Sequence, residues 1–104
     1  MSYRRVVVRC DNTSDLDQSA QAEFVGDTHD RLDGSGIRGY FVAGTGTNWI
    51  EWEGTATEID DKLGEHFNDP RVGEYTILED TLIPSIDHEM WVGHCEACAM
   101  ETLD

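Results

Sequence analysis

The stretch IRGYFVAGTGTNWIEWEGT, residues 37–55, contains two apolar segments joined by a turn. Glycine, threonine and asparagine fill its middle, at 44–48, and these residues accept the backbone conformations of a tight connection. Aromatic and β-branched residues dominate the two flanks and favour strands. The stretch therefore predicts a β-hairpin. Residues of the second strand alternate between two faces, with Ile50 and Trp52 on one and Trp49, Glu51 and Glu53 on the other.

Outside the hairpin, the chain predicts three more strands and two helices. The first strand is rich in valine, and its alternation puts Val6, Val8 and Cys10 on one face. Each helix has apolar residues at helical spacing. We expect Thr13 or Ser14 to cap the first helix and Thr57 to cap the second. The expected strands are 3–10, 37–43, 49–55, 72–79 and 89–95, and the expected helices are 14–32 and 57–67.

The order of these elements predicts the fold class. Strand, helix, strand, strand, helix, strand is the ferredoxin-like split βαβ arrangement, with strand order 4-1-3-2 when the crossovers are right-handed. We expect one α+β domain over residues 1–104, with an antiparallel sheet, both helices on one face and an extra C-terminal strand beside the fourth. The alternative is a small β-rich barrel or sandwich in which 14–32 is a long loop.

Acidic residues dominate the composition. The 22 Asp and Glu against 7 Lys and Arg give a formal net charge of −15 over 104 residues. Self-repulsion on this scale destabilises a compact domain in dilute buffer, and concentrated salt screens it. We therefore expect a halophilic protein of a high-salt cytoplasm, or of a particle assembled there. Such a surface repels phosphates at low salt, and molar salt nearly abolishes that repulsion, so the acidity alone does not exclude nucleic acid. A nucleic-acid partner is nevertheless not expected, because no motif for one is complete.

Two nucleic-acid interpretations stay open as alternatives. The acidic surface would also suit a mimic of DNA that occupies a basic groove. The segment RGYFV at 38–42 resembles a fragment of the aromatic strand of the RNA-recognition motif, which would imply an RNA-binding domain. It lacks the small residue between the aromatics and lies on the second expected strand instead of the third.

Membrane insertion and secretion are not expected. No apolar run approaches the roughly 18 residues needed to span a bilayer, and the N-terminus lacks the apolar core of a signal peptide. The 3 cysteines are an odd number, which argues against a secreted disulfide framework.

The cysteines form the sharpest candidate for chemistry. Cys95 and Cys98 make a Cys-x-x-Cys pair, and Cys10 ends the first strand. If the fifth strand lay beside the fourth, all three thiols would meet at one end of the sheet. With His88, or His94 in its place, they would complete a tetrahedral zinc site that staples a thin core.

The same cysteines allow two other interpretations. All three thiols can be plain small side chains in or near the core. Alternatively, Cys95 and Cys98 can be a thiol–disulfide redox pair, since a thiolate at a helix start beside a histidine has a lowered pKa. Against the redox interpretation, Glu96 and the anionic tail raise the pKa of both thiols, and only six residues follow Cys98.

We expect no catalytic activity, because no combination of serine, histidine and carboxylate stands out among so many acids. The predicted function is that of a regulatory or structural interaction module, in a cellular or a viral assembly, with a protein partner or a second copy of itself. Its contact surface is the open face of the sheet, where aromatic anchors of the kind that interfaces favour lie among charges. The expected contact residues are Arg5, Arg9, Tyr40, Trp49, Glu51 and Glu53.

Overall fold

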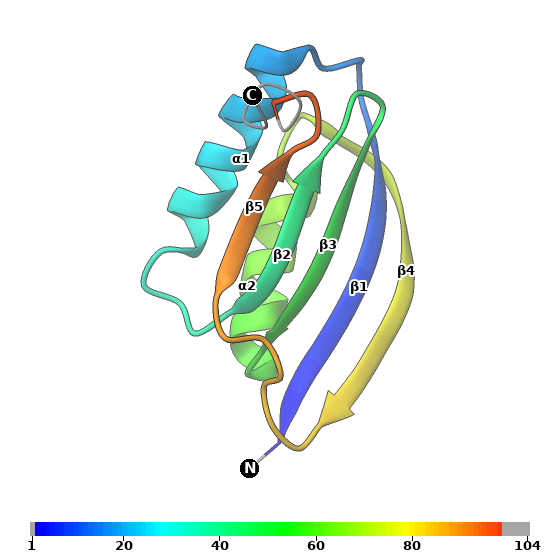
Figure 1. Ribbon diagram of the computed structural model, residues 1–104. Helices are drawn as coiled ribbons and strands as arrows, with labels where there is room; N and C mark the ends of the chain where they lie inside the picture. Colours follow the sequence, from blue (N-terminus) through cyan, green and yellow to red (C-terminus); the bar gives the residue numbers. More distant parts are fainter. Residues whose placement is uncertain (1, 99–104) are drawn as a thin grey trace.

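The computed structural model describes residues 2–98, in which five strands form a sheet and two helices cover one of its faces (Figure 1). No helix in this part of the chain is long and apolar enough to cross a membrane. The elements in chain order are β1 (Tyr3–Asn12), α1 (Gln18–Leu32), β2 (Arg38–Ala43), β3 (Thr47–Gly54), α2 (Ala56–Phe67), β4 (Val72–Ile83) and β5 (Trp91–Cys95).

The sheet has the order β4-β1-β3-β2-β5. Its first four strands are antiparallel neighbours in the predicted order 4-1-3-2, so the ferredoxin-like prediction is confirmed. The position of the fifth strand was predicted wrongly. β5 lies on the opposite edge from β4 and pairs with β2 in parallel, which makes the sheet mixed.

Two contacts explain why β5 lies beside β2. The segment between β4 and β5 crosses the open face, where Glu53 binds the backbone N–H groups of Asp87 and His88. After His88 the chain continues into β5, which packs against α1 beside β2. Gly93 permits the close approach, because a Cβ there would lie 2.5 Å from Val25 Cγ1. The fifth strand thus packs along the side of α1, between Gln21 and Asp30.

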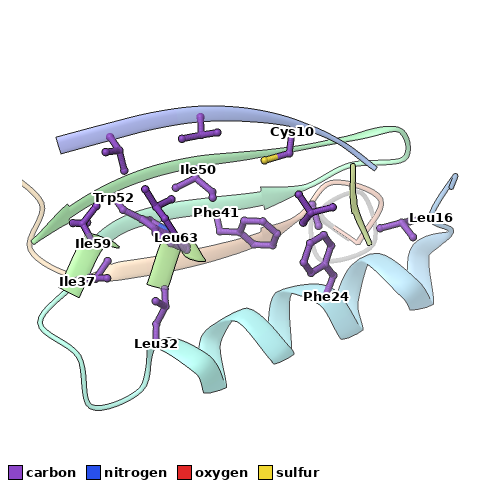
Figure 2. Close-up of a cluster of buried hydrophobic side chains, with 14 residues drawn as sticks. Cys10, Leu16, Phe24, Leu32, Ile37, Phe41, Ile50, Trp52, Ile59 and Leu63 are labelled. Carbon is purple, nitrogen blue, oxygen red and sulfur yellow. The ribbon is translucent and has the colours of Figure 1, made fainter. Parts of the chain in front are cut away.

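The core lies between the helices and the sheet (Figure 2). The strand residues predicted to face the helices do so and are fully buried: Val6, Val8, Cys10, Ile50 and Trp52. From the helices, Phe24 and Leu63 project toward them. The alternation in β1 and β3 therefore identified the buried face, because successive side chains of a strand point to opposite sides.

Both helices begin at other residues than predicted. The carboxylate of Asp17 accepts from Ala20 N at 2.9 Å and caps α1, so Thr13 and Ser14 lie outside the helix. The Thr13 hydroxyl instead donates to the Pro70 carbonyl at 2.8 Å. Thr55, two residues before the expected cap, accepts from Glu58 N and caps α2. In each case several residues had capping ability, and tertiary contacts decided which one was used.

His66, on α2, belongs to an aromatic cluster in the core. Its ring stacks on Phe24 with centroids 5.7 Å apart, and its Nε2 lies 2.9 Å from Asn48 Oδ1. Burial, and to a lesser extent the nearby Arg31 guanidinium, lowers the pKa of His66 to about 3. His66 is therefore a neutral residue of the core.

Candidate functional site

The open face of the sheet carries all six predicted contact residues. Side chains that are paired across strands share a face, and Val8 faces the helices, so Arg9 and its partners lie on the other side. Arg9 pairs with Trp49, and Arg5 pairs with Glu53. Arg5 thus faces a carboxylate as predicted, whereas Arg9 faces an indole. Tyr40 and Glu51 pair across β2 and β3 between these two positions.

A buried carboxylate organises one end of this face. Glu53 is fully buried, and its Oε1 accepts from Asp87 N at 2.8 Å and from His88 N at 3.1 Å. Its Oε2 accepts from Arg5 Nε at 2.6 Å. Burial alone would raise the pKa of Glu53, but the two backbone donors and Arg5 outweigh it and lower the pKa. Glu53 is therefore an ionised, structural anchor for the segment that crosses the face.

A second set of contacts holds the same segment. His88 Nε2 lies 2.6 Å from Glu51 Oε2, and the Tyr40 hydroxyl is 3.4 Å from Glu51 Oε1. The Tyr40 and His88 rings meet edge to face, 6.1 Å between centroids. Asp87 adds an ion pair with Arg5. We call Arg5, Tyr40, Glu51, Glu53, Asp87 and His88 the latch.

Latch residues serve the protein's own fold, and this changes the predicted contact surface. Four of the six residues predicted to form the contact surface belong to the latch and are half-buried or buried. They are Arg5, Tyr40, Glu51 and Glu53. Sequence reasoning missed Asp87 and His88 as their partners. Their backbone N–H groups bind Glu53, and a backbone donor leaves no mark in the sequence. Their side chains pair with Arg5 and Glu51 only because the segment crosses the face, which the strand pattern does not predict.

At the other end of the face, a row of side chains crosses the whole sheet. The pairings place one residue from each strand side by side: His94, Val42, Trp49, Arg9 and Thr76. We call these five residues the free row. Arg9, His94 and Thr76 are exposed, and Trp49 is half-buried. Arg9 forms no ion pair with any residue of 2–98, whereas Arg5 binds Glu53.

The predicted zinc site does not form. Cys10 is buried on the helix side of β1, and β3 and β2 separate it from β5. Burial, and to a lesser extent the Asp11 carboxylate, raises the pKa of Cys10 to about 12, so it is a neutral thiol. Within residues 2–98 no group of three or more His, Cys, Asp or Glu side chains could hold a metal ion. The prediction failed because it placed the fifth strand beside the fourth.

The remaining expected ligands are also occupied elsewhere. Cys95 and Cys98 form a disulfide with a Cα–Cα distance of 5.1 Å, so neither offers a thiolate. The turn that it closes is held against α1, where Gln21 Oε1 accepts from Ala97 N at 2.9 Å. His88 belongs to the latch. His94, adjacent to Cys95 on β5, points to the open face instead of the helix side.

Comparisons with known proteins show the fold. No protein-family model matches the sequence, and no curated protein is significantly similar to it. Among solved structures, the chain is similar to BlrB, described as a BLUF protein, with 18% identity and a TM-score of 0.71. The match covers 99% of this chain and 84% of that one.

Two larger proteins contain the same fold as one part. For BlrP1 from Klebsiella pneumoniae, in a calcium and cyclic-diGMP complex, the identity is 14% and the TM-score 0.76, over 94% of this chain and 25% of that one. For a bacterial light-regulated adenylyl cyclase, the identity is 13% and the TM-score 0.72. That match covers 88% of this chain and 28% of the cyclase. This chain thus spans only about a quarter of each. At such identities the likeness establishes a ferredoxin-like α+β fold.

Proposed function

We propose that this chain is a non-catalytic interaction module that binds a partner protein, or a second copy of itself, through the free row. The observation that carries the proposal is the pair Arg9 and Trp49. An arginine without an ion pair among residues 2–98 lies beside a half-buried tryptophan, at the end of the open face away from the latch. Arginine and tryptophan are the side chains that most often dominate binding energy at interfaces.

The similar structures support a regulatory module. In the light-regulated cyclase and in BlrP1 the matching region is about a quarter of the chain, so the fold occurs there as one part of a larger protein, which in the first case is regulated by light. A module of that kind acts by contact with other domains or proteins. The open sheet face here provides a surface for such contacts, because both helices lie on the other side (Figure 1).

The residues of this chain do not fit the FMN that one BlrP1 structure contains. A flavin has three fused rings and needs an enclosed, largely apolar slot. In this fold the enclosed space is the layer between helices and sheet, and aromatic side chains fill it. Phe24 and Phe41 are 4.9 Å apart between ring centroids, His66 stacks on Phe24, and Trp52 meets His66 edge to face. All four are fully buried, so this layer has no room for a flavin ring, and the proposal rests on the free row alone.

Site-specific photocrosslinking tests the free row. A benzoylphenylalanine at position 49 should crosslink one partner species in an extract of the source organism kept in concentrated KCl. If the two residues form a hot spot, Arg9→Ala should lower the crosslinked yield at least about tenfold, because hot-spot side chains contribute about 2 kcal/mol or more.

Thr57 provides the matched control position. It is exposed on α2, on the opposite side of the molecule, so the same crosslinker there should not capture that species. Equal capture from positions 49 and 57, or no capture from position 49 in an extract where the protein is abundant, would contradict the proposal. A crosslinked dimer of the chain would identify the partner as a second copy.

The disulfide favours a second candidate function, thiol–disulfide exchange. A small dithiol would reduce the Cys95–Cys98 bond, transferring two electrons and two protons while its own thiols form a disulfide. Dithiothreitol in defined ratios of reduced to oxidised form should then interconvert the pair, read by alkylation and mass spectrometry. Cys10 serves as the internal control, because its buried thiol with a raised pKa should alkylate slowly throughout. A disulfide that stays closed at every ratio in the folded protein would eliminate this function.

A further inference from the structure

A hollow lies between α1 and the edge strand β5, on the helix side of the sheet, whereas the latch and the free row lie on the open face. Its volume is about 470 Å³, and it is open to solvent along one side. Val25, Gly26 and His29 line it from the helix, and Trp91 and Gly93 line it from the strand. Ligand sites commonly have volumes of 300–1,000 Å³, so the hollow is large enough for one or two side chains of a bound peptide.

The strand beside this hollow has a free edge. β5 is the last strand of the sheet and pairs only with β2 within residues 2–98 (Figure 1). Gly39 N donates to Met90 O, and Glu96 N donates to Ala43 O. Because successive residues of a strand direct their backbone groups to opposite sides, those of Trp91 and Gly93 point away from β2. An unpaired row of this kind is a template for another strand.

The hollow contains a helical glycine, which leaves space, and a buried polar group without a partner among residues 2–98. A Cβ on Gly26 would meet no atom within 4 Å, so this helical glycine leaves the hollow open. The indole Nε1 of Trp91 is buried and has no acceptor in the described part of the chain. Apolar walls beside a free backbone edge are the elements of peptide recognition by strand addition, in which backbone bonds give affinity and pockets select side chains.

Acidic side chains at the hollow favour a basic partner. Asp30 lines the hollow, and Asp33 lines the smaller hollow that continues past Trp91. Neither hollow is lined by lysine or arginine. A second copy would bring the same carboxylates to this rim, and like charges that face each other oppose binding. A basic segment is the complementary partner.

We propose that the groove between α1 and β5 binds an extended segment of another protein by strand addition, with an apolar side chain in the hollow and lysine or arginine beside it. The segment adds a sixth strand to the sheet along β5. The hollow lies on the helix side of the sheet and the free row on the open face; they share β5, which carries His94, and substitutions at Trp49 and Gly26 separate the two tests.

Selection from a phage library of random short peptides provides the probe. Enriched peptides should carry an apolar residue flanked by lysine or arginine. The best of them, synthesised and titrated into labelled protein, should shift the amide resonances of residues 91–95 and of α1 near Gly26. Trp49→Ala should leave their affinity unchanged, which separates this site from the free row.

Two glycine variants make the test specific. Gly26→Leu places an apolar side chain at the hollow, at a position where a Cβ meets no atom within 4 Å, and should weaken binding at least about tenfold, or 1.4 kcal/mol. Gly64→Leu is the matched control, because Gly64 is exposed on α2 and a Cβ there also meets no atom within 4 Å. It should bind normally, and thermal melts should show both variants folded. No enrichment, equal binding to Gly26→Leu, or shifts confined to the other edge strand, β4, would overturn the proposal.

Discussion

Glu53→Ala should lower the free energy of unfolding by about 3 to 5 kcal/mol, the usual loss when one partner of a buried ion pair is removed. Glu53 is fully buried and accepts three hydrogen bonds, from Arg5 and from the backbone of Asp87 and His88. The variant leaves all three donors without this acceptor. Chemical denaturation measures the loss, and hydrogen exchange at residues 87 and 88 should accelerate because the crossing segment is released.

Glu79→Ala is the matched control for this prediction. Glu79 also pairs with Arg5, at 3.7 Å, but its side chain is 40% exposed. Exposed ion pairs contribute about 0 to 1 kcal/mol, so this variant should lose no more than that. Equal losses in the two variants would show that burial of Glu53 is not what stabilises the latch.

The pH dependence of the Glu53 effect has a definite sign. The folded protein lowers the pKa of Glu53 below its ordinary value of 4.5. Its contribution is therefore complete above pH 4.5 and is lost as pH falls through the lowered pKa, because protonation then favours the unfolded state. The difference between wild type and Glu53→Ala should be constant near neutral pH and shrink in acid.

Gly39→Ala should also lower the free energy of unfolding by about 3 to 5 kcal/mol, for a different reason. Gly39 lies on β2 with φ of +128°, a conformation that residues with a side chain rarely adopt. A Cβ there would lie 1.9 Å from the Glu51 carbonyl oxygen on β3, so the two strands would have to separate. Thermal or denaturant unfolding measures the loss.

Gly46→Ala is the control variant. Replacing any glycine by alanine lowers the conformational entropy of the unfolded chain, and this variant measures that effect without a steric clash. Gly46 lies in the hairpin turn, its φ is not positive, and a Cβ there meets no atom within 4 Å. This variant should change stability by less than about 1 kcal/mol in either direction. A fully stable Gly39→Ala protein would mean that β2 and β3 can pair without the close contact at this position.

Local patterns predicted most of the fold. The valines of β1 and the alternation of Ile50 and Trp52 in β3 identified the buried face, because burial of one face imposes a period of two on a strand. Helix and strand order then left few topologies with right-handed crossovers. Helix starts were less certain, since Asp17 and Thr55 cap the helices while neighbouring residues had equal capping ability.

The candidate site divided into a part that the sequence could predict and a part that it could not. Arg5 opposite Glu53 followed from strand order and alternation. The crossing segment did not, because Glu53 holds it through backbone N–H groups, and any residue could supply those. Of the six contact residues expected from the sequence, only Arg9 and Trp49 lie outside the latch. Within residues 2–98 no other segment forms an ion pair with Arg9. Salt dependence of folding stays a prediction from the net charge.

The sequence by itself determined the class of fold and the buried face of the central strands, since both depend on short-range patterns and the order of the elements. Only the tertiary structure decided where β5 lies, because an edge strand is chosen by contacts far apart in the chain, here Glu53 with Asp87 and Gly93 with Val25. That choice separated Cys10 from the Cys95–Cys98 disulfide and so removed the metal site. It also created the free edge and the hollow beside α1.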